Sequence, residues 1–263
     1  MENLKDINFK KKFGQNFLTD TNLLKAIVSD ANVCEDDVVI EIGAGAGALT
    51  KELAKKAQKV ISFEVDTELE SVLKENLKEF DNISIIFEDF LNFDEEKIYA
   101  LAGDNFKIVA NLPYYITTPI ITKLFNLKNR PSSIVVMVQK EVGERIVATA
   151  KNGNYGYFSA YVKANADAFI VRNVGRKMFT PPPKVDSCIV VMSLKENEYP
   201  KEFFEFLKNV FKMKRKTLLN NISASYDINK SELEKKVGKE KLSQRADALD
   251  IENLYQLYSE IFS

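Results

Sequence analysis

Histidine and tryptophan are both absent from the 263 residues, and there are only 2 cysteines. Without an imidazole the chain cannot form a Ser-His-Asp or Cys-His arrangement, and most zinc and iron sites lose their usual ligands. Cys34 and Cys188 lie far apart in the sequence, which argues against a disulfide framework or a cysteine-rich metal site and favours a reduced, intracellular setting. We therefore expect no bound metal and a chemistry that uses other groups.

Long hydrophobic runs are also absent. No apolar run reaches the roughly 20 residues needed to span a membrane, and residues 1–6 lack the apolar core of a signal peptide. We expect a cytoplasmic protein with no membrane partner, and we take a monomer as the default. Because 45% of the residues are hydrophobic, the chain can form one or two domains with a substantial core.

The chain contains 37 basic and 38 acidic residues, so neither sign of charge dominates and the net charge is −1. A nucleic-acid partner would therefore require the charges to be separated in space. Residues 201–241 contain 11 basic and 6 acidic residues, and Lys10, Lys11 and Lys12 form a second basic cluster. Solvated helix faces would give the same pattern, so charge alone leaves nucleic-acid binding open.

Strand-like and helix-like segments alternate over the first two-thirds of the chain, which indicates an α/β fold with a mostly parallel sheet between two layers of helices. Apolar residues recur at helical spacing in segments such as 47–56 and 67–77. The predicted strands are short and rich in Val and Ile, and they span residues 38–42, 59–64, 83–87, 107–111 and 133–138. Five such strands make a doubly wound, Rossmann-like sheet.

A proline-rich loop at residues 179–184 separates two further strand-like runs, 168–174 and 185–194, with no long helix between them. This pattern predicts an antiparallel pair at the edge of the sheet. After Pro200 the strand signal stops and the apolar residues recur at helical intervals. We therefore expect a larger domain over residues 1–195 and a small all-helical domain over residues 196–263.

A glycine-rich turn joins the first predicted strand to the next helix. Gly43, Gly45 and Ala48 fit the dinucleotide-binding template, and Glu64 follows about twenty residues later, where an acid can hold ribose hydroxyls. Glycines let a ligand lie against bare backbone. These features predict a cofactor that contains adenosine, and they leave a nicotinamide and a sulfonium cofactor both open.

The ends of the next two strands favour methyl transfer to a planar amine. Residues 88–90, Glu-Asp-Phe, can place an acid and an aromatic ring beside an adenine, and residues 111–114 read Asn-Leu-Pro-Tyr. The exocyclic amine of adenine is a poor nucleophile because its lone pair is delocalised. The side-chain oxygen of Asn111 and a backbone carbonyl held by Pro113 can accept its two N–H groups, while Tyr114 stacks on the base. Proton loss can follow the transfer, so no histidine is required.

With these motifs the chain resembles the ribosomal RNA adenine dimethyltransferases, specifically the bacterial enzymes that dimethylate two adjacent adenosines near the end of small-subunit RNA. The resemblance covers nearly the whole chain. It rests on residues 13–18, 41–50, 64, 88–90, 111–116, 179–187, 215–218 and 244–249.

The resemblance implies S-adenosylmethionine as the cofactor and assigns residues to it. The implied cofactor contacts are Asn16, Leu18, Gly43, Gly45, Glu64, Asp89 and Asn111. Asn111, Leu112, Pro113 and Tyr114 would be the catalytic residues, with the carbonyl of Leu112 or Pro113 as the second acceptor. Tyr114 and Phe179 would sandwich the target adenine.

The resemblance also implies a partner, which is small-subunit ribosomal RNA within an immature 30S particle. Enzymes reach atoms in structured nucleic acid by extruding the base, so the target would lie in an accessible loop. Phosphates would then meet the basic residues Lys10, Lys11, Lys12, Lys212, Lys214, Arg215 and Lys216.

Four alternatives remain at this stage. The sister family that methylates large-subunit RNA and confers macrolide resistance usually has Ile in place of Leu112 and lacks the motif at residues 181–187. DNA adenine methylases use a related tetrad but carry target-recognition insertions. An NAD-dependent reductase would explain the glycine turn and Glu64 but not the tetrad. A non-catalytic RNA-binding assembly factor on the same fold would not need the tetrad.

Overall fold

The computed structural model describes residues 17–196 and 198–262, which form two compact units. Of these residues, 17–143 and 169–194 belong to the first unit, and 144–168, 195–196 and 198–262 belong to the second. Asn16 and the cluster Lys10, Lys11 and Lys12 lie outside the described residues. Among the described residues, no helix is long and apolar enough to cross a membrane.

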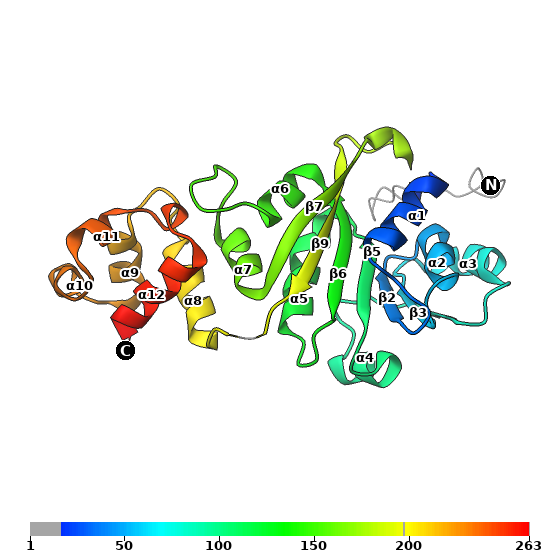
Figure 1. Ribbon diagram of the computed structural model, residues 1–263, viewed down its shortest axis with the longest axis horizontal. Helices are drawn as coiled ribbons and strands as arrows, with labels where there is room; N and C mark the ends of the chain where they lie inside the picture. The colour runs from blue at the N-terminus through cyan, green and yellow to red at the C-terminus, as the bar shows by residue number, and fades with distance from the viewer. Residues whose placement is uncertain (1–16, 197, 263) are drawn as a thin grey trace. The chain divides into compact units, whose positions relative to one another are not determined.

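A seven-stranded sheet forms the centre of the first unit, with strand order β4-β3-β2-β5-β6-β9-β7 (Figure 1). Neighbouring strands from β4 to β6 are parallel, and β9 pairs with β6 in the antiparallel direction. The strands are β2 (Val38–Ile42), β3 (Lys59–Phe63), β4 (Ile83–Ile86), β5 (Lys107–Asn111), β6 (Ser133–Gln139), β7 (Ala166–Val174) and β9 (Ser187–Leu194). The predicted α/β class and the added edge pair are confirmed.

Both faces of the sheet are buried, because apolar residues occupy successive positions of the central strands. Val39 and Val109 belong to one core cluster with residues of α1 and α2, while Ile40 and Ile108 point to the opposite face. The helices of this part of the chain are α1 (Thr21–Asp30), α2 (Ala48–Ala54), α3 (Glu70–Leu77), α4 (Glu95–Ala102), α5 (Thr117–Asn126) and α6 (Lys140–Ile146). This packing fixes the strand ends that carry the motifs.

A second, two-stranded sheet joins distant parts of the sequence. Strand β1 (Phe17–Leu18) pairs with β8 (Phe179–Thr180) in the antiparallel direction, with Leu18 opposite Phe179. The amide of Thr19 also donates to the carbonyl of Met178 at 3.3 Å. The proline-rich loop is thereby attached to the segment that precedes α1.

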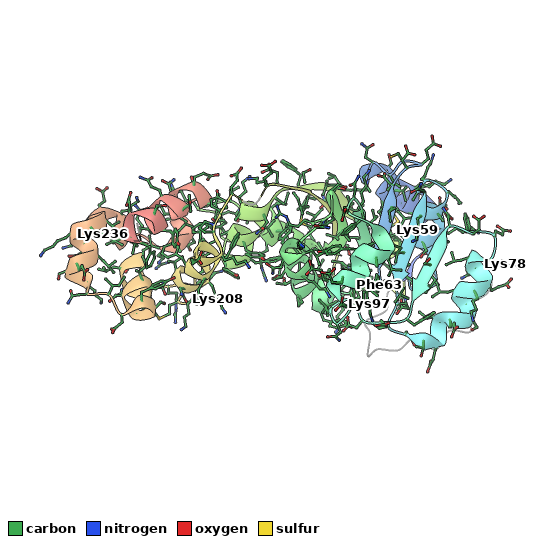
Figure 2. The ribbon with its side chains drawn as sticks, turned by 90° about the horizontal axis from the view of Figure 1, so that it is seen from below. Lys59, Phe63, Lys78, Lys97, Lys208 and Lys236 are labelled. Carbon is green, nitrogen blue, oxygen red and sulfur yellow. The ribbon has the colours of Figure 1, made fainter. Side chains whose placement is uncertain are left out.

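The second unit is helical. It contains α7 (Tyr157–Asn165), α8 (Lys201–Val210), α9 (Leu218–Tyr226), α10 (Lys230–Val237), α11 (Lys239–Ser243) and α12 (Ile251–Phe262). Its core combines Phe203 and Phe206 of α8 with Leu254 and Leu257 of α12 and with apolar residues of α9 to α11. Charged residues cover the outside, among them Lys208 on α8 and Lys236 on α10 (Figure 2).

The boundary between the units differs from the one predicted at residue 195. Leu194 does end the first unit, but residues 144–168 belong to the helical unit. The reason is that Ala160 and Ala164 of α7 are fully or almost fully buried in the same core as Phe203. A hydrophobic stripe shows that a helix has a buried face, but it does not show which neighbour covers that face.

Candidate active site

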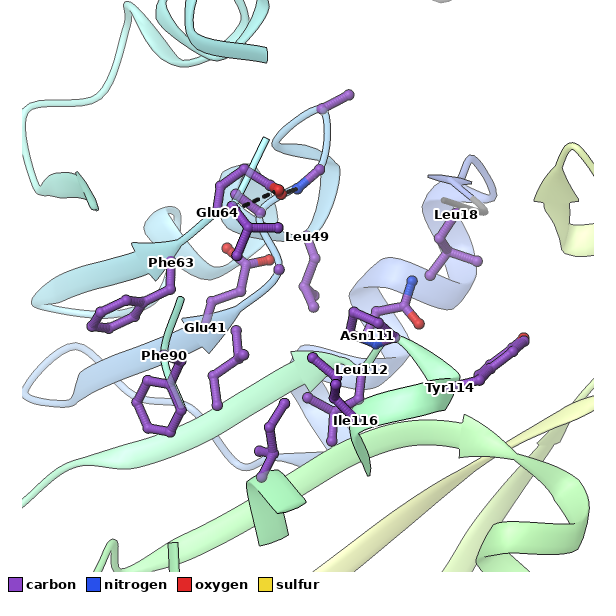
Figure 3. Close-up of a pocket in the computed structure, with 18 of the residues that line it drawn as sticks. Leu18, Glu41, Leu49, Phe63, Glu64, Phe90, Asn111, Leu112, Tyr114 and Ile116 are labelled. Atoms are coloured by element: carbon purple, nitrogen blue, oxygen red, sulfur yellow. Dashed lines mark hydrogen bonds between the residues drawn. The ribbon is translucent and has the colours of Figure 1, made fainter. Parts of the chain in front are cut away.

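A cavity of about 370 Å³ lies at the carboxyl ends of β2, β3, β4 and β5 (Figure 3). A doubly wound sheet binds its ligands at the carboxyl ends of its parallel strands. The cavity brings together all the predicted cofactor and catalytic residues that the structure describes. They are Leu18, Gly43, Gly45, Glu64, Asp89, Asn111, Leu112, Pro113, Tyr114 and Phe179.

The glycine turn after β2 has the backbone conformation that its sequence predicts. Gly43, Gly45 and Gly47 all have positive φ angles, of 91°, 55° and 83°, a region that residues with a Cβ rarely adopt. The amide of Gly43 donates to the carbonyl of Phe63 at 2.8 Å, which ties the turn to the end of β3. The turn is therefore a fixed part of the cavity wall.

Glu64 links the same two strand ends through its side chain. Its Oε2 accepts from the amide of Gly45 at 2.8 Å, and its Oε1 accepts from the amides of Val65 and Asp66 at 2.8 and 2.9 Å (Figure 3). Burial raises the pKa of Glu64 against the effect of these three hydrogen bonds. The carboxylate is thus held in place at the cavity edge, with oxygen lone pairs left to accept from a ligand.

Glu41 is a cavity residue to which the sequence analysis gave no role. It is 1% exposed, and its Oε2 accepts from the hydroxyls of Thr50 and Ser62 at 2.6 and 2.5 Å. Its Oε1 is buried and has no hydrogen-bond partner among the described residues. Burial raises the pKa of Glu41 to about 8. The signal available in the sequence was an acid inside an apolar strand directly before the glycine turn.

A lysine on α5 holds the loop that follows β4. Lys123 Nζ donates to the carbonyls of Phe90, Leu91 and Phe93 at 2.7, 3.0 and 2.6 Å. An ammonium group has three N–H donors, so the three carbonyls use all of them. Asp89 accepts from the amide of Leu91 at 2.9 Å, and the loop therefore presents Asp89 to the cavity in a fixed position.

Phe90 follows Asp89 in the cavity wall, and its ring is largely buried. It is 2% exposed, and its ring packs edge-to-face against Phe63 with centroids 5.1 Å apart. Lys123 Nζ lies 5.2 Å from the centre of the ring. Phe90 therefore forms the floor of the cavity as a packed core residue.

Asn111 is the last residue of β5, and Leu112 continues the ladder because its amide donates to the carbonyl of Met137 at 3.1 Å. Pro113 precedes the 3-10 turn η4 (Tyr114–Ile116). Asn111 and Tyr114 are both half-buried in the cavity wall, and Figure 3 shows their side chains on the same side of the strand ends. Asn111 and Tyr114 therefore place a polar acceptor and an aromatic ring next to the same part of the cavity.

A buried hydroxyl fixes the ring of Tyr114. The Tyr114 hydroxyl lies 2.9 Å from Ser187 Oγ, and Ser187 at the start of β9 is fully buried. Burial raises the pKa of Tyr114, so the phenol remains neutral at ordinary pH. The ring can therefore present a face to a ligand without turning away.

Phe179 reaches the cavity from β8, but it is only 3% exposed and belongs to the core cluster that contains Leu18. Its predicted stacking role remains a prediction.

The predicted RNA-binding residues of the second half lie in the helical unit. Lys212, Lys214, Arg215 and Lys216 are exposed in the loop between α8 and α9. Asn221 holds this loop, because its side chain accepts from the amide of Met213 at 3.1 Å and donates to the carbonyl of Met213 at 3.2 Å. The loop is thus a defined basic surface.

Known proteins are similar to this chain over nearly its whole length. A family described as ribosomal RNA adenine dimethylase matches residues 6–261. A protein of Ligilactobacillus salivarius, named ribosomal RNA small subunit methyltransferase A, is 42% identical over 253 residues, which cover 93% of this chain and 83% of that protein. A protein of the same name from Clostridium acetobutylicum is 38% identical and covers 98% of this chain and 95% of its own length.

Among solved structures, a dimethyladenosine transferase from Plasmodium falciparum is similar to this chain with a TM-score of 0.79 and 28% identity. The similarity covers 93% of this chain and 97% of that one. The likeness therefore includes both the sheet and the helical region.

Proposed function

Because the chain belongs to the ribosomal RNA adenine dimethylase family, we propose that it dimethylates the exocyclic N6 amines of two adjacent adenosines near the 3′ end of small-subunit ribosomal RNA. As a member of this family it is an enzyme that uses S-adenosylmethionine. The relatives named for small-subunit RNA support this target over large-subunit RNA. We further propose that it acts as a cytoplasmic monomer on an immature 30S particle and takes part in small-subunit maturation.

The observation that carries the proposal is the position of the Asn-Leu-Pro-Tyr segment, residues 111–114, in the same cavity as the glycine turn. A reductase has no use for an amine acceptor and a stacking ring beside its cofactor turn. A binding protein without catalysis would not need the two to share one cavity. Methyl transfer to an aromatic amine needs both.

The cavity residues fit S-adenosylmethionine on an observation of this structure. Oε1 of Glu41 is a buried carboxyl oxygen without a partner among the described residues, and such an atom requires a hydrogen-bond partner to offset its desolvation. The charged amino group of a bound cofactor would supply this partner and would favour the ionised form of the carboxyl group. Glu64 would accept from ribose hydroxyls and Asp89 from the adenine amine, while Gly43 and Gly45 leave room for the methionine portion. When bound, the cofactor supplies a methyl group on a sulfonium.

The target amine would be held by two acceptors at the end of β5. Asn111 Oδ1 is one, and we assign the carbonyl of Leu112 as the other. The carbonyl of Pro113 already accepts from the amide of Ile116 at 3.2 Å and from the hydroxyl of Thr117 at 3.4 Å, which leaves Leu112 as the better placed group. Two acceptors favour a pyramidal nitrogen whose lone pair points at the methyl group.

Tyr114 would stack on the extruded base and orient it, with Ser187 holding the phenol. Most of the rate then arises from alignment of the amine with the methyl group. The proton that the amine loses after transfer can pass to water, because the product is a positively charged nitrogen. The absence of histidine from the sequence is therefore consistent with this reaction.

The test is incubation of the protein with radiolabelled S-adenosylmethionine and either immature small subunits or large-subunit RNA, followed by nucleoside mass spectrometry. We expect N6,N6-dimethyladenosine in the small-subunit RNA only. Label confined to large-subunit RNA would assign the chain to the resistance enzymes, and label on neither RNA would favour an assembly factor. Cells that lack the protein should also lose dimethyladenosine from small-subunit RNA.

A further inference from the structure

The connection between β7 and β9, residues 175–186, forms one rim of the cavity, and we refer to it as the rim loop. It contributes Phe179 to the cavity wall, and Ser187, which follows it, contacts Tyr114. Figure 1 shows it as the yellow-green segment beyond the ends of β7 and β9. The rim loop therefore borders the part of the cavity wall that contains Tyr114.

Several hydrogen bonds hold the rim loop in one conformation. Asp186 Oδ1 accepts from the amide of Arg176 at 3.0 Å, and the carbonyl of Asp186 accepts from the amide of Lys140 at 3.0 Å. The amide of Met178 donates to the carbonyl of Gly175 at 3.0 Å, and Thr180 lies in the β1–β8 pair. A loop anchored in this way can present its side chains at defined positions.

The rim loop carries an excess of exposed positive charge. Arg176, Lys177 and Lys184 are all exposed, and within residues 17–196 and 198–262 no ion pair joins any of them to a carboxylate. Asp186 is the one acid of the loop, and its Oδ1 is engaged by the amide of Arg176. By contrast, Arg172 on β7 makes two hydrogen bonds of 3.0 Å to Asp30, so its charge is balanced.

Two exposed apolar side chains lie among these cations. Met178 is 40% exposed and Val185 is 44% exposed. Positive groups interleaved with apolar side chains suit a sugar-phosphate backbone, because cations meet the phosphates and apolar groups cover riboses and bases.

We propose that the rim loop is a binding site for the RNA backbone, in which Arg176, Lys177 and Lys184 contact the phosphates on either side of the target adenosine. This inference rests on the proposed function. A base extruded into the cavity stays attached to its ribose and its two phosphodiester groups, so these groups must lie at the cavity mouth. Among the described residues of the first unit, the rim loop is a cationic segment that also contributes a residue to the cavity wall.

The site differs from the basic loop at residues 212–216 in what it would do. Phosphate contacts made by the helical unit, to which the basic loop belongs, raise affinity for the whole RNA, whereas contacts made beside the cavity fix the position of the target nucleotide. The rim loop should therefore affect both the salt dependence of binding and the efficiency of transfer to the correct adenosine.

The test is the triple variant Arg176→Gln, Lys177→Gln and Lys184→Gln, which removes three charges and keeps polar side chains of moderate length. The matched control is Lys56→Gln, Lys78→Gln and Lys128→Gln. These exposed lysines precede β3, β4 and β6. They therefore lie near the amino ends of these strands, opposite the carboxyl ends that form the cavity. Both variants change the net charge equally, and Figure 2 shows Lys78 at the outer surface.

The measurement is the dissociation constant for a synthetic RNA hairpin with the two adenosines in its loop, without cofactor, over a range of salt concentrations. The slope of the logarithm of the association constant against log[salt] is negative, by about 0.7 for each neutralised phosphate of a single strand. With two phosphates flanking the target adenosine, we expect the magnitude of this slope to decrease by about 1.4 in the rim-loop variant. We expect affinity to fall at least tenfold at low salt. The control variant should keep the wild-type slope, and both variants should bind S-adenosylmethionine as the wild type does.

An unchanged slope in the rim-loop variant would overturn the proposal, as would an equal loss in the control. Methylation of small-subunit RNA by the wild-type protein is measured separately and tests the proposed function. If the wild type methylates the RNA and the rim-loop variant binds it normally, only the rim-loop inference fails. If the wild type transfers no methyl group to any RNA, the proposed function fails whatever the salt slope.

Discussion

Asn111 ends a buried parallel strand and places a half-buried polar side chain in the cavity. We expect Asn111→Ala to lower kcat by about 10²–10³-fold, which corresponds to about 3–4 kcal/mol of transition-state stabilisation, because one amine acceptor is lost. The free energy of unfolding should change little. Single-turnover methyl transfer and urea denaturation measure the two effects, and near-normal turnover would refute the role.

Glu41 makes stability depend on pH in an unusual direction. Burial raises the pKa of Glu41 from 4.5 to about 8. Between pH 4.5 and 8 the folded protein therefore keeps a proton on Glu41 that the unfolded chain has lost. The stability from this group is therefore full below about pH 4.5 and is lost as pH rises toward 8. Glu41→Gln should flatten the fall in unfolding free energy between pH 5 and 8, measured by urea denaturation at each pH. An equally steep fall in the variant would exclude Glu41 as its source.

At the scale of elements, Lys123 connects α5 to the loop after β4 with three hydrogen bonds to carbonyls. Lys123→Met keeps the length of the side chain but leaves three carbonyls without this donor. We expect the affinity for S-adenosylmethionine to fall about tenfold, because the loop that carries Asp89 loses its anchor, while affinity for RNA stays unchanged. Calorimetry measures the first and filter binding the second. Lys128→Met, which removes an exposed lysine, is the control.

The contact between α6 and β9 depends on a glycine that the sequence analysis did not single out. A Cβ at Gly143 would lie 2.1 Å from Sγ of buried Cys188 and 3.3 Å from Cγ2 of Val190. Gly143→Ala should therefore lower the free energy of unfolding by about 1–3 kcal/mol. Adding Cys188→Ala removes the nearest atom, so the double variant should recover part of the loss. Thermal denaturation of the two single variants and the double variant tests this, and strictly additive losses would contradict the steric explanation.

The sequence predicted the strands well because each is a short β-branched run that ends in a polar or glycine residue. Residues 38–42 and 107–111 are strands with those same bounds. Strand β9 begins at Ser187 instead of the predicted residue 185, because Asp186 is used in hydrogen bonds that close the rim loop. Periodicity identifies an extended segment but does not show where tertiary contacts end it.

The cavity was predictable only in part. The glycine turn, Asp89 and the Asn-Leu-Pro-Tyr segment follow strand ends, and topology brings such ends together. Glu41, Lys123 and Ser187 act through contacts with residues distant in the sequence, namely Ser62, the loop after β4, and Tyr114. Nothing in the local pattern of a lysine on a helix or a serine at a strand start indicates such a partner.

At the scale of the whole molecule, the two units separate cofactor binding from part of the RNA binding. The basic loop at residues 212–216 belongs to the helical unit, whereas the cavity belongs to the first unit. We expect Lys214→Glu with Arg215→Glu to weaken RNA binding at least tenfold and to leave the affinity for S-adenosylmethionine unchanged. Lys235→Glu with Lys239→Glu, on exposed positions of the same unit, is the control. Unchanged RNA affinity across a salt titration would reject this placement.

The pairing of β1 with β8 has a consequence for the order in which the enzyme is completed during synthesis. Leu18 emerges from the ribosome early, but its partner Phe179 is made after all five parallel strands. A nascent chain that already contains the glycine turn and the Asn-Leu-Pro-Tyr segment still lacks one wall of its cavity. The cofactor cavity of the growing polypeptide is therefore incomplete until residue 180 has been translated. The chain becomes able to bind its ligand only in the last third of translation.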